Sequence, residues 1–299
     1  MSFSSTMKIV VTIPAYNEEK TIGSLINKIN EVMGNGKYEY KVMVVDDGSK
    51  DKTAEVAKLA NAVVYSHPKN YGLADTFRTE TEKALKLGAD VIVHIDADIQ
   101  YKPEEIPLLL KEIENGYDLV LGSRFKGKIE YMPIIKKLGN KAFSRVVSNI
   151  TGIRISDAQT GFRAFTKDVA EKIKITSNHT YTQEQIIRAV KKKFKIKEVP
   201  VYFAKRNDKS RLISNPFKYA ISAWINLIRT YRDYEPLKFF GLTGTSIFSI
   251  GLLIGLYLTY LHFTSGIVGH FALMMLDILI LSIGLQIIIF GFLADMNRK

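Results

Sequence analysis

The chain has 299 residues, which is enough for one large domain or for a catalytic domain with an appendage. It contains no cysteine, which excludes disulfides and thiolate metal sites. Its 42 Lys and Arg against 30 Asp and Glu give a net charge of +12, with fourteen basic and four acidic residues in 188–238. Such a basic block suits nucleic acid, an anionic membrane surface or a phosphorylated substrate.

Strand-like and helix-like segments alternate through the first part of the chain. Apolar strand patterns occur at 8–13, 41–45, 62–65, 91–95 and 119–122, and helical patterns occur between them at 18–33, 52–59, 74–87 and 104–114. This alternation predicts an α/β fold with a mostly parallel, Rossmann-like sheet that helices cover on both faces. Ligands of such sheets bind beyond the carboxyl ends of the strands.

Polar clusters follow three of the predicted strands. They consist of Pro14, Tyr16, Asn17 and Glu18 after the first strand, Asp46, Asp47, Gly48 and Ser49 after the second, and Asp96 and Asp98 after the fourth. A single cluster of this kind is often only a turn or a helix cap. Because three clusters converge on one sheet edge, we interpret them as a binding site.

The Asp96-Ala97-Asp98 motif predicts a metal–diphosphate site. Side chains alternate along an extended chain, so both carboxylates leave the strand on the same side, and Gln100 adds a further oxygen there. Mg²⁺ is typically held by one or two carboxylates together with substrate phosphates. The alternative is a pair of solvated aspartates that opens a turn before Pro103.

The C-terminal part predicts two membrane-spanning helices. Residues 239–276 contain no Asp, Glu, Lys or Arg, and after the single Asp277 the chain stays uncharged to residue 294. The run divides into segments 239–262 and 271–294, each at least as long as the ~20 residues that span a bilayer. The alternative is a buried helical hairpin in a soluble protein. Asp277 either faces a neighbouring helix in neutral form or contacts another subunit.

Charge placement predicts the orientation of this hairpin in the cell membrane. Lys238 precedes it, Arg298 and Lys299 follow it, and the connecting loop has no Lys or Arg. The positive-inside rule therefore places both termini and the N-terminal domain in the cytoplasm. Residues 1–6 lack an apolar signal core, so no secretory peptide is expected.

An amphipathic helix is predicted directly before the first span, within residues 215–234. Its apolar residues recur at three- and four-residue steps, namely Phe217, Ile221, Trp224, Ile225, Ile228 and Tyr231. This pattern fits a helix that lies in the membrane interface, and the alternative is a helix packed on the N-terminal domain. The expected division is an α/β domain at 1–212, a juxtamembrane helix at 213–236 and two transmembrane helices at 237–296.

Several motifs resemble those of family 2 glycosyltransferases, whose catalytic domain has the GT-A fold. They are Ile-Pro-Ala-Tyr-Asn-Glu-Glu at 13–19, Val-Val-Asp-Asp-Gly-Ser at 44–49, Asp-Ala-Asp at 96–98 and Gly-Ser-Arg at 122–124. Residues 157–163 and 197–201, together with Arg206, Ser210 and Arg211, are similar to the dolichyl-phosphate mannose synthase branch and its bacterial polyprenyl-phosphate relatives.

The resemblance implies roles for individual residues. The nucleotide sugar would be bound by Pro14, Tyr16, Glu18, Asp46, Asp47 and Asp96, and Mg²⁺ or Mn²⁺ by Asp96, Asp98 and Gln100. The acceptor phosphate would be bound by Arg124, Lys136, Arg206, Ser210 and Arg211. The alternative for each basic residue is a charge that faces solvent or the lipid headgroups. Asp98, Arg124, Arg206 and Glu184 would take part in catalysis. Glu184 lies where other family 2 enzymes place a base, and we interpret it as an acceptor-site residue.

The resemblance also implies an activity. The enzyme would move a hexose, with inversion, from a nucleotide sugar of the GDP-mannose or UDP-glucose type to dolichyl or polyprenyl phosphate. One alternative is a processive polysaccharide synthase, whose Gln-x-x-Arg-Trp motif is absent because the only tryptophan, Trp224, follows Ala223. Another is a non-catalytic, membrane-anchored nucleotide-sugar-binding module. Nucleic acid is not an expected partner, and a homo-oligomer formed through the spanning helices stays open.

Overall fold

The computed structural model describes residues 7–177, 181–205, 225, 228–266 and 270–297 of the chain. The chain divides into two compact units, Met1–Tyr219 and Ala220–Lys299. The expected division at residues 212 and 236 stays a prediction. Most of the predicted juxtamembrane helix lies outside the described residues, so its interfacial placement stays a prediction.

The N-terminal unit is built on a seven-stranded sheet with the order β3-β2-β1-β4-β6-β5-β7. Its strands are β1 (Lys8–Ala15), β2 (Glu39–Asp46), β3 (Val63–Ser66), β4 (Val91–His94), β5 (Leu119–Ser123), β6 (Arg163–Thr166) and β7 (Ile196–Pro200). Only β6 runs antiparallel to its neighbours within this sheet. The predicted α/β class with a mostly parallel sheet is thus confirmed, and the five predicted strands coincide with β1–β5.

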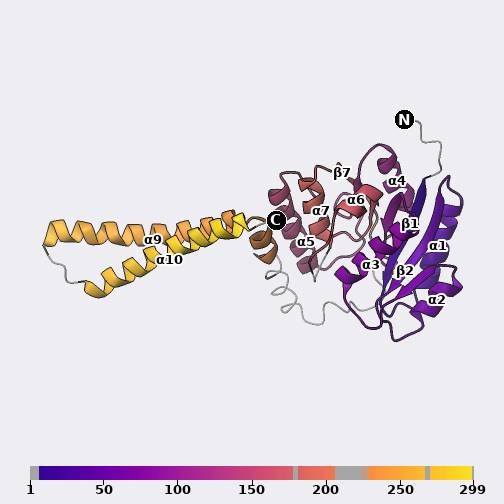
Figure 1. The fold of residues 1–299 in the computed structure, drawn as a ribbon, viewed down its shortest axis with the longest axis horizontal. Helices are drawn as coiled ribbons and strands as arrows, with labels where there is room; N and C mark the ends of the chain where they lie inside the picture. The colour runs from indigo at the N-terminus through magenta and orange to yellow at the C-terminus, as the bar shows by residue number, and fades with distance from the viewer. Residues whose placement is uncertain (1–6, 178–180, 206–224, 226–227, 267–269, 298–299) are drawn as a thin grey trace. The chain divides into compact units, whose positions relative to one another are not determined.

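Helices cover both faces of this sheet. They are α1 (Ile22–Gly34), α2 (Thr53–Leu59), α3 (Leu73–Lys86), the short 3-10 helix η1 (Pro103–Glu105), α4 (Ile106–Glu114), α5 (Ile134–Thr151), α6 (Lys167–Lys172) and α7 (Thr182–Lys191). Figure 1 shows α1 and α2 on one side of β1 and β2, with α3 on the other.

Alternation along β1 explains the two layers. Val11 pairs with Val42 and Val93 of the adjacent strands, and these side chains form one buried core with Leu25 of α1. The next residue, Thr12, faces the opposite side of the sheet and is also buried.

The first helix begins at Ile22, four residues later than predicted. The intervening loop is bonded to the loop that follows β2: the backbone N–H of Asn17 donates to Ser49 Oγ at 2.8 Å, and that of Glu18 donates to Thr53 Oγ1 at 2.8 Å. Asn17, directly before the predicted helix, has a left-handed φ of 54°, which a right-handed helix does not contain. Tertiary hydrogen bonds therefore hold this segment as a loop.

The C-terminal unit contains two long apolar helices, α9 (Pro236–Ser265) and α10 (Phe271–Met296), which lie side by side in Figure 1. Both are long and apolar enough to span a membrane, and only 11% of the most apolar 18-residue stretch of each is buried. A core helix of a soluble protein would be mostly buried, so this hairpin indicates a membrane anchor.

Glycines allow close packing of α9 against α10. A Cβ atom on Gly284 would lie 2.6 Å from the backbone nitrogen of Phe248, and one on Gly244 would lie 2.8 Å from the carbonyl oxygen of Gly284. Small residues of this kind let helix backbones approach within a membrane. Asp277 is buried in this hairpin, and its Oδ1 atom has no hydrogen-bond partner among the described residues.

Candidate active site

The sheet order brings the three predicted polar clusters to one edge. β2, β1 and β4 are parallel neighbours, so the residues that follow them share the carboxyl edge of the sheet. The loops are also joined directly, because the backbone N–H of Asp47 donates to the carbonyl of Ala15 at 2.8 Å. Asp46 accepts from the backbone N–H of Ser49 at 3.1 Å, which closes the turn after β2.

Asp96 lies at this edge with its side chain 35% exposed. A Cβ atom on Gly161 would come within 2.7 Å of the carboxyl carbon of Asp96, so the carboxylate rests on bare backbone that only glycine provides. Burial opposes ionisation of Asp96, but the interaction with His94 and the charges of Arg124 and Arg163 outweigh it and lower the pKa of the carboxyl group.

A buried polar network lies beneath Asp96. The Nδ1 atom of His94 contacts Glu80 Oε2 at 2.9 Å, its Nε2 atom lies 2.7 Å from the hydroxyl of Tyr181, and Asp96 Oδ1 is 3.8 Å away. Burial alone would lower the pKa of His94, but Glu80 and Asp96 raise it to about 9. These carboxylates favour the protonated form of the imidazole. Beside it the rings of Phe77 and Tyr181 stack, with 3.9 Å between their centroids.

Asp98 and Gln100 follow in a tight turn. Asp98 Oδ1 accepts from the backbone N–H of Gln100 at 3.2 Å, and Ile99 between them has a φ of 57°. The side-chain amide nitrogen of Gln100, Nε2, donates to the carbonyl of Ala204 at 3.0 Å, which connects this turn to the chain after β7.

The carboxylates fit a divalent metal that is shared with a diphosphate. Among the described residues, no group of three or more His, Cys, Asp or Glu could hold a metal by itself. Mg²⁺ keeps few protein ligands and completes its shell with phosphates and water. Asp96 and Asp98 would be those ligands, and the bound ion would neutralise charge on the diphosphate.

Both carboxylate oxygens of Asp47 bind a neighbouring loop. Its Oδ1 atom accepts from the backbone N–H of Tyr71 at 2.9 Å and contacts His67 Nδ1 at 2.7 Å, while its Oδ2 atom accepts from the backbone N–H of Gly72 at 2.8 Å. Both oxygens are thus engaged within the protein. Its predicted contact with a nucleotide stays a prediction.

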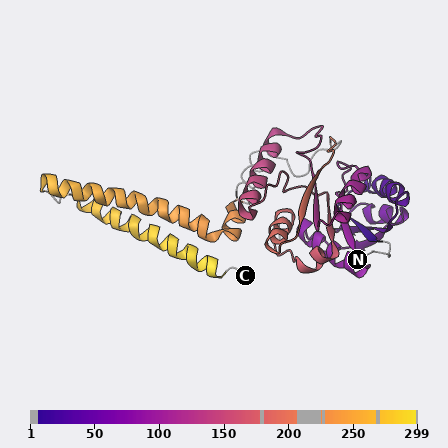
Figure 2. The ribbon, with the colours of Figure 1, turned by 90° about the horizontal axis from the view of Figure 1, so that it is seen from above.

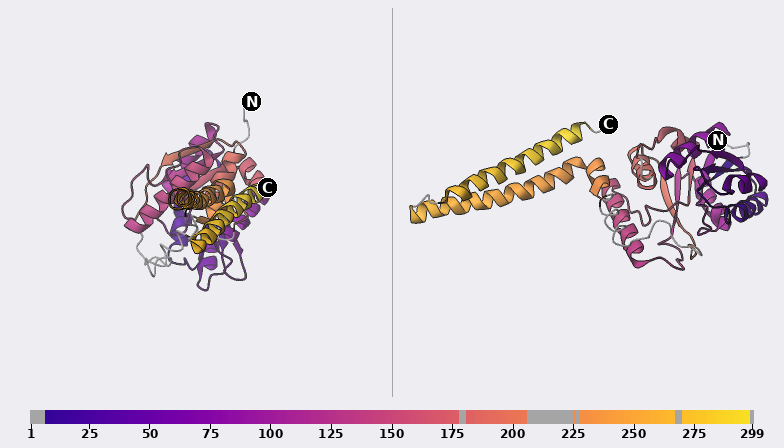
Figure 3. Two further views of the ribbon diagram at one scale, coloured as in Figure 1. Left: turned by 90° about the vertical axis from the view of Figure 1, so that its left-hand side faces the viewer. Right: turned by 90° about the horizontal axis from the view of Figure 1, so that it is seen from below.

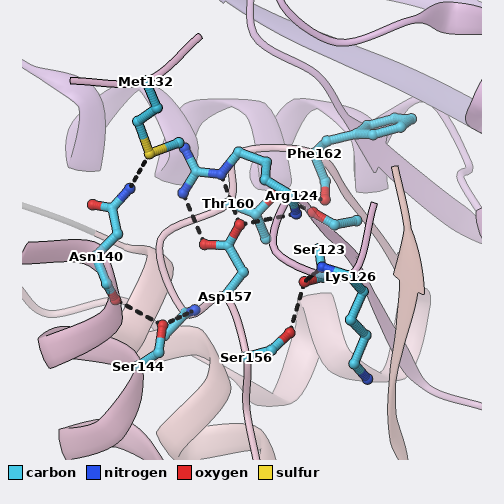
Figure 4. A network of polar contacts seen from close by, with 12 residues as sticks. Ser123, Arg124, Lys126, Met132, Asn140, Ser144, Ser156, Asp157, Thr160 and Phe162 are labelled. Carbon is cyan, nitrogen blue, oxygen red and sulfur yellow. Dashed lines mark hydrogen bonds and ion pairs between the residues drawn. The ribbon is translucent and has the colours of Figure 1, made fainter. Parts of the chain in front are cut away.

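Arg124 forms a buried bidentate pair with Asp157 (Figure 4). Its Nε atom donates to Asp157 Oδ2 at 2.7 Å, and its Nη2 atom donates to Oδ1 at 2.8 Å. Asp157 is itself fixed, because its backbone N–H donates to Glu198 of β7 at 3.0 Å. Arg124 carries three further N–H donors beyond this fork, so the predicted phosphate contact would have to use those.

The remaining predicted acceptor residues are not gathered at this edge by the described contacts. Glu184 of α7 is buried, accepts from the backbone N–H groups of Thr176 and Ser177 at 2.9 Å each, and pairs with Arg188 at 2.7 Å. Lys136 lies in the first turn of α5. Arg206, Ser210 and Arg211 lie outside the described residues.

Sequence reasoning assigned no role to Gly161, Asp157, His94 or Glu80. Gly161 and Asp157 belong to the Asp-Ala-Gln-Thr-Gly-Phe-Arg motif at 157–163, which was the sequence feature that could have indicated their roles. His94 lies in the predicted apolar strand at 91–95, and Glu80 lies in the predicted helix at 74–87. Their contact joins residues fourteen positions apart, which no local pattern encodes.

A mostly parallel sheet with an Asp-x-Asp turn after β4 and an antiparallel β6 defines a GT-A domain, the fold of a large class of glycosyltransferases. The family model described as "Glycosyl transferase family 2" matches residues 10–174. The chain therefore belongs to glycosyltransferase family 2 and is a glycosyltransferase, as the motifs predicted.

Relatives of named activity resemble the chain over much of its length. A dolichyl-phosphate hexose transferase of Haloferax volcanii is 34% identical, covering 70% of this chain and 87% of that protein. An undecaprenyl-phosphate 4-deoxy-4-formamido-L-arabinose transferase of Photorhabdus laumondii is 28% identical, covering 99% of this chain and 90% of that protein.

The fold is also found in solved structures. Glucosyl-3-phosphoglycerate synthase from Mycobacterium tuberculosis, crystallised with Mn²⁺ and UDP-glucose, superposes with a TM-score of 0.57 at 20% identity. The match covers 74% of this chain and 79% of that one, which demonstrates the shared fold.

Proposed function

We propose that the chain transfers a hexose from a nucleotide sugar to a dolichyl or polyprenyl phosphate at the cytoplasmic face of the cell membrane. The observation that carries this proposal is the placement of Asp96 and Asp98 at the carboxyl edge of the sheet in a chain that also holds an apolar hairpin. The named relatives act on dolichyl or undecaprenyl phosphate, which supports the same acceptor class here.

The acceptor chemistry needs no strong base. A phosphate monoester has a second pKa near 6 and is largely a dianion at neutral pH. One of its oxygens would form the new bond to the anomeric carbon while the bond from that carbon to the diphosphate breaks, so that the nucleoside diphosphate leaves and the configuration inverts. The protein would position two anionic groups and offset their charge.

The protein's charges suit this task. The pKa of Asp96 is lowered, so its carboxylate is ionised and ready to bind Mg²⁺ or Mn²⁺. Asp46 and the loop after β1 would hold the nucleoside, next to the metal ligands along the same edge. Arg124 and the basic residues near 206–211 would meet the phosphates, for which the planar fork of arginine is well suited.

A transfer assay tests the proposal directly. Full-length protein in detergent would receive one short polyprenyl phosphate, Mg²⁺ or Mn²⁺ and, in turn, labelled GDP-mannose, UDP-glucose and UDP-N-acetylglucosamine. We expect label in the lipid phase with one donor and none after lipid phosphate is omitted. Label transferred in equal amount without lipid phosphate, or to a growing polysaccharide, would contradict the proposed acceptor.

A further inference from the structure

Three buried polar side chains lie on the face of the sheet that is turned away from α1. Thr12 of β1 pairs with His94 of β4 in the sheet register, so the two side chains share this face. Glu80 of α3 and Tyr181, which directly precedes α7, contact His94 there. Figure 2 and the right panel of Figure 3 show α1 (indigo) and α7 (salmon) on opposite sides of the sheet. We call Glu80, His94 and Tyr181 the polar trio.

Packing alone does not account for the polar trio. Glu80 is 1% exposed, and His94 and Tyr181 are 0% exposed. Polar groups lose hydration on burial, and apolar side chains of similar volume often replace them without loss of stability. Phe77 already packs on both rings: its ring centroid lies 3.9 Å from that of Tyr181 and 5.5 Å from that of His94. The polar atoms of the trio therefore indicate a role beyond filling this space.

Both ring nitrogens of His94 have partners, which fix the plane and the direction of the imidazole. Nδ1 lies 2.9 Å from Glu80 Oε2, and Nε2 lies 2.7 Å from the Tyr181 hydroxyl. Nε2 is also the atom nearest to the site, 3.8 Å from Asp96 Oδ1. The Asp96 carboxylate rests on the bare backbone of Gly161 as well. These two neighbours limit the directions in which the carboxylate can point.

We propose that the polar trio positions Asp96 for the divalent metal, an inference that rests on the proposed function because that function supplies the metal. His94 acts through Asp96, and Glu80 and Tyr181 act through His94. The three are positioning residues, since none of them contacts the metal or the substrate. A carboxylate that is already held in its binding direction loses less freedom when Mg²⁺ or Mn²⁺ binds, and the partners of metal ligands tune metal affinity in this way.

An apolar replacement of the whole trio separates positioning from packing. The triple variant Glu80→Met, His94→Leu and Tyr181→Phe keeps similar volumes and the ring that stacks on Phe77. It removes one acidic and one basic group together, so the net charge beneath Asp96 changes little. Replacing buried polar groups by apolar ones of similar volume is often neutral or stabilising, so we expect a melting temperature that is unchanged or higher.

Mn²⁺ binding gives the readout that a packing role would not change. Full-length protein in detergent would be titrated with Mn²⁺ in the presence of GDP and, separately, of UDP, and free Mn²⁺ followed by paramagnetic resonance. We expect the triple variant to bind Mn²⁺ about ten- to hundredfold more weakly than the unaltered protein, as removal of the partners of a metal ligand commonly does.

Tyr181→Phe provides a second, milder variant that removes only one hydroxyl group. We expect Mn²⁺ binding to weaken by about two- to tenfold, the contribution of one hydrogen bond. Tyr38→Phe is the matched control, because the Tyr38 hydroxyl donates to a carboxylate, that of Glu114, at 2.9 Å. Tyr38 precedes β2 and so lies at the other edge of the sheet from the site, and its variant should bind Mn²⁺ like the unaltered protein.

The outcomes separate this inference from the proposed function. Failure of the unaltered protein to bind Mn²⁺ with either nucleotide would refute the metal assignment itself. Mn²⁺ binding by the unaltered protein that Tyr181→Phe and the folded triple variant match or exceed would refute the positioning role alone. Calorimetry of GDP and UDP binding in excess EDTA should give equal affinities for all these proteins. A parallel loss of nucleotide binding there would assign the trio to general packing of the sheet edge and overturn the proposal.

Discussion

The carboxylate of Asp96 rests directly on the backbone of Gly161, because the chain passes residue 161 just before it enters antiparallel β6, whose Arg163 pairs with His94 at the end of β4. A methyl group at position 161 would have to displace the carboxylate, since the Cβ atom would lie within 2.7 Å of its carbon.

Gly161→Ala should therefore impair the site while the fold persists. Misplacement of a reacting group by about 1 Å can cost a hundredfold in rate, so we expect a loss of that order in kcat/KM. Gly34→Ala is the matched control, because its Cβ atom would make an ordinary contact at 3.6 Å with Tyr40. Steady-state kinetics and thermal unfolding would be compared, and unchanged kinetics in Gly161→Ala would refute a role for this contact.

Asp98→Ala should abolish metal-dependent transfer. Loss of one carboxylate removes a ligand of the ion that offsets the diphosphate charge, and we expect a fall in kcat of about a hundredfold or more. Titration of Mn²⁺ in the presence of nucleoside diphosphate, followed by paramagnetic resonance, should show weaker binding. Full activity of this variant, or of the unaltered enzyme in excess EDTA, would contradict the metal assignment.

Asp157→Ala should destabilise the N-terminal unit strongly. It leaves the guanidinium of Arg124 buried without its partner, and breaking a buried pair in this way costs about 3–5 kcal/mol. Asp168→Ala, which breaks the exposed pair with Lys172, should leave the melting temperature nearly unchanged. Circular dichroism melts of both variants give the comparison, and equal melting temperatures would mean that the Arg124–Asp157 pair contributes little.

The orientation of the hairpin can be tested with cysteine labelling in intact cells. The basic residues lie at the outer ends of the hairpin, at Lys238, Arg298 and Lys299, and none lies in its turn. Thr264→Cys should react with a membrane-impermeant maleimide from outside the cell, whereas Lys50→Cys should react only after lysis. The reverse pattern would place the active site outside the cytoplasm.

Arg206→Ala should weaken use of the lipid phosphate without affecting the donor. Charge-assisted contacts of this type contribute roughly 1.5–3 kcal/mol, which corresponds to an increase of about ten- to hundredfold in the KM for polyprenyl phosphate. Arg206→Lys should recover part of the loss, because lysine keeps the charge but not the planar fork. Calorimetry of donor binding is the control, and a collapse there would assign Arg206 to the donor diphosphate.

Local pattern was sufficient to predict much of this protein. Continuous apolar runs predicted β1–β5 and the hairpin, because strands covered on both faces and helices that span a bilayer carry apolar side chains along most of their length. The motifs at 13–19, 44–49 and 96–98 predicted the carboxyl edge of the sheet and the family. Strand β6 was not predicted, since four residues that begin with Arg163 do not resemble a buried strand.

Tertiary structure alone decided what surrounds the predicted carboxylates. His94 lies beneath Asp96 and is held by Glu80 of α3 and by Tyr181, which directly precedes α7. Arg124 pairs with Asp157, which lies 33 residues further along the chain. Asp47 accepts hydrogen bonds from the loop at 71–72. Sequence determines which side chains can carry charge and where strands end. Which charges meet in the buried space between elements depends on strand order and helix packing, and those follow from contacts that no local window of sequence contains.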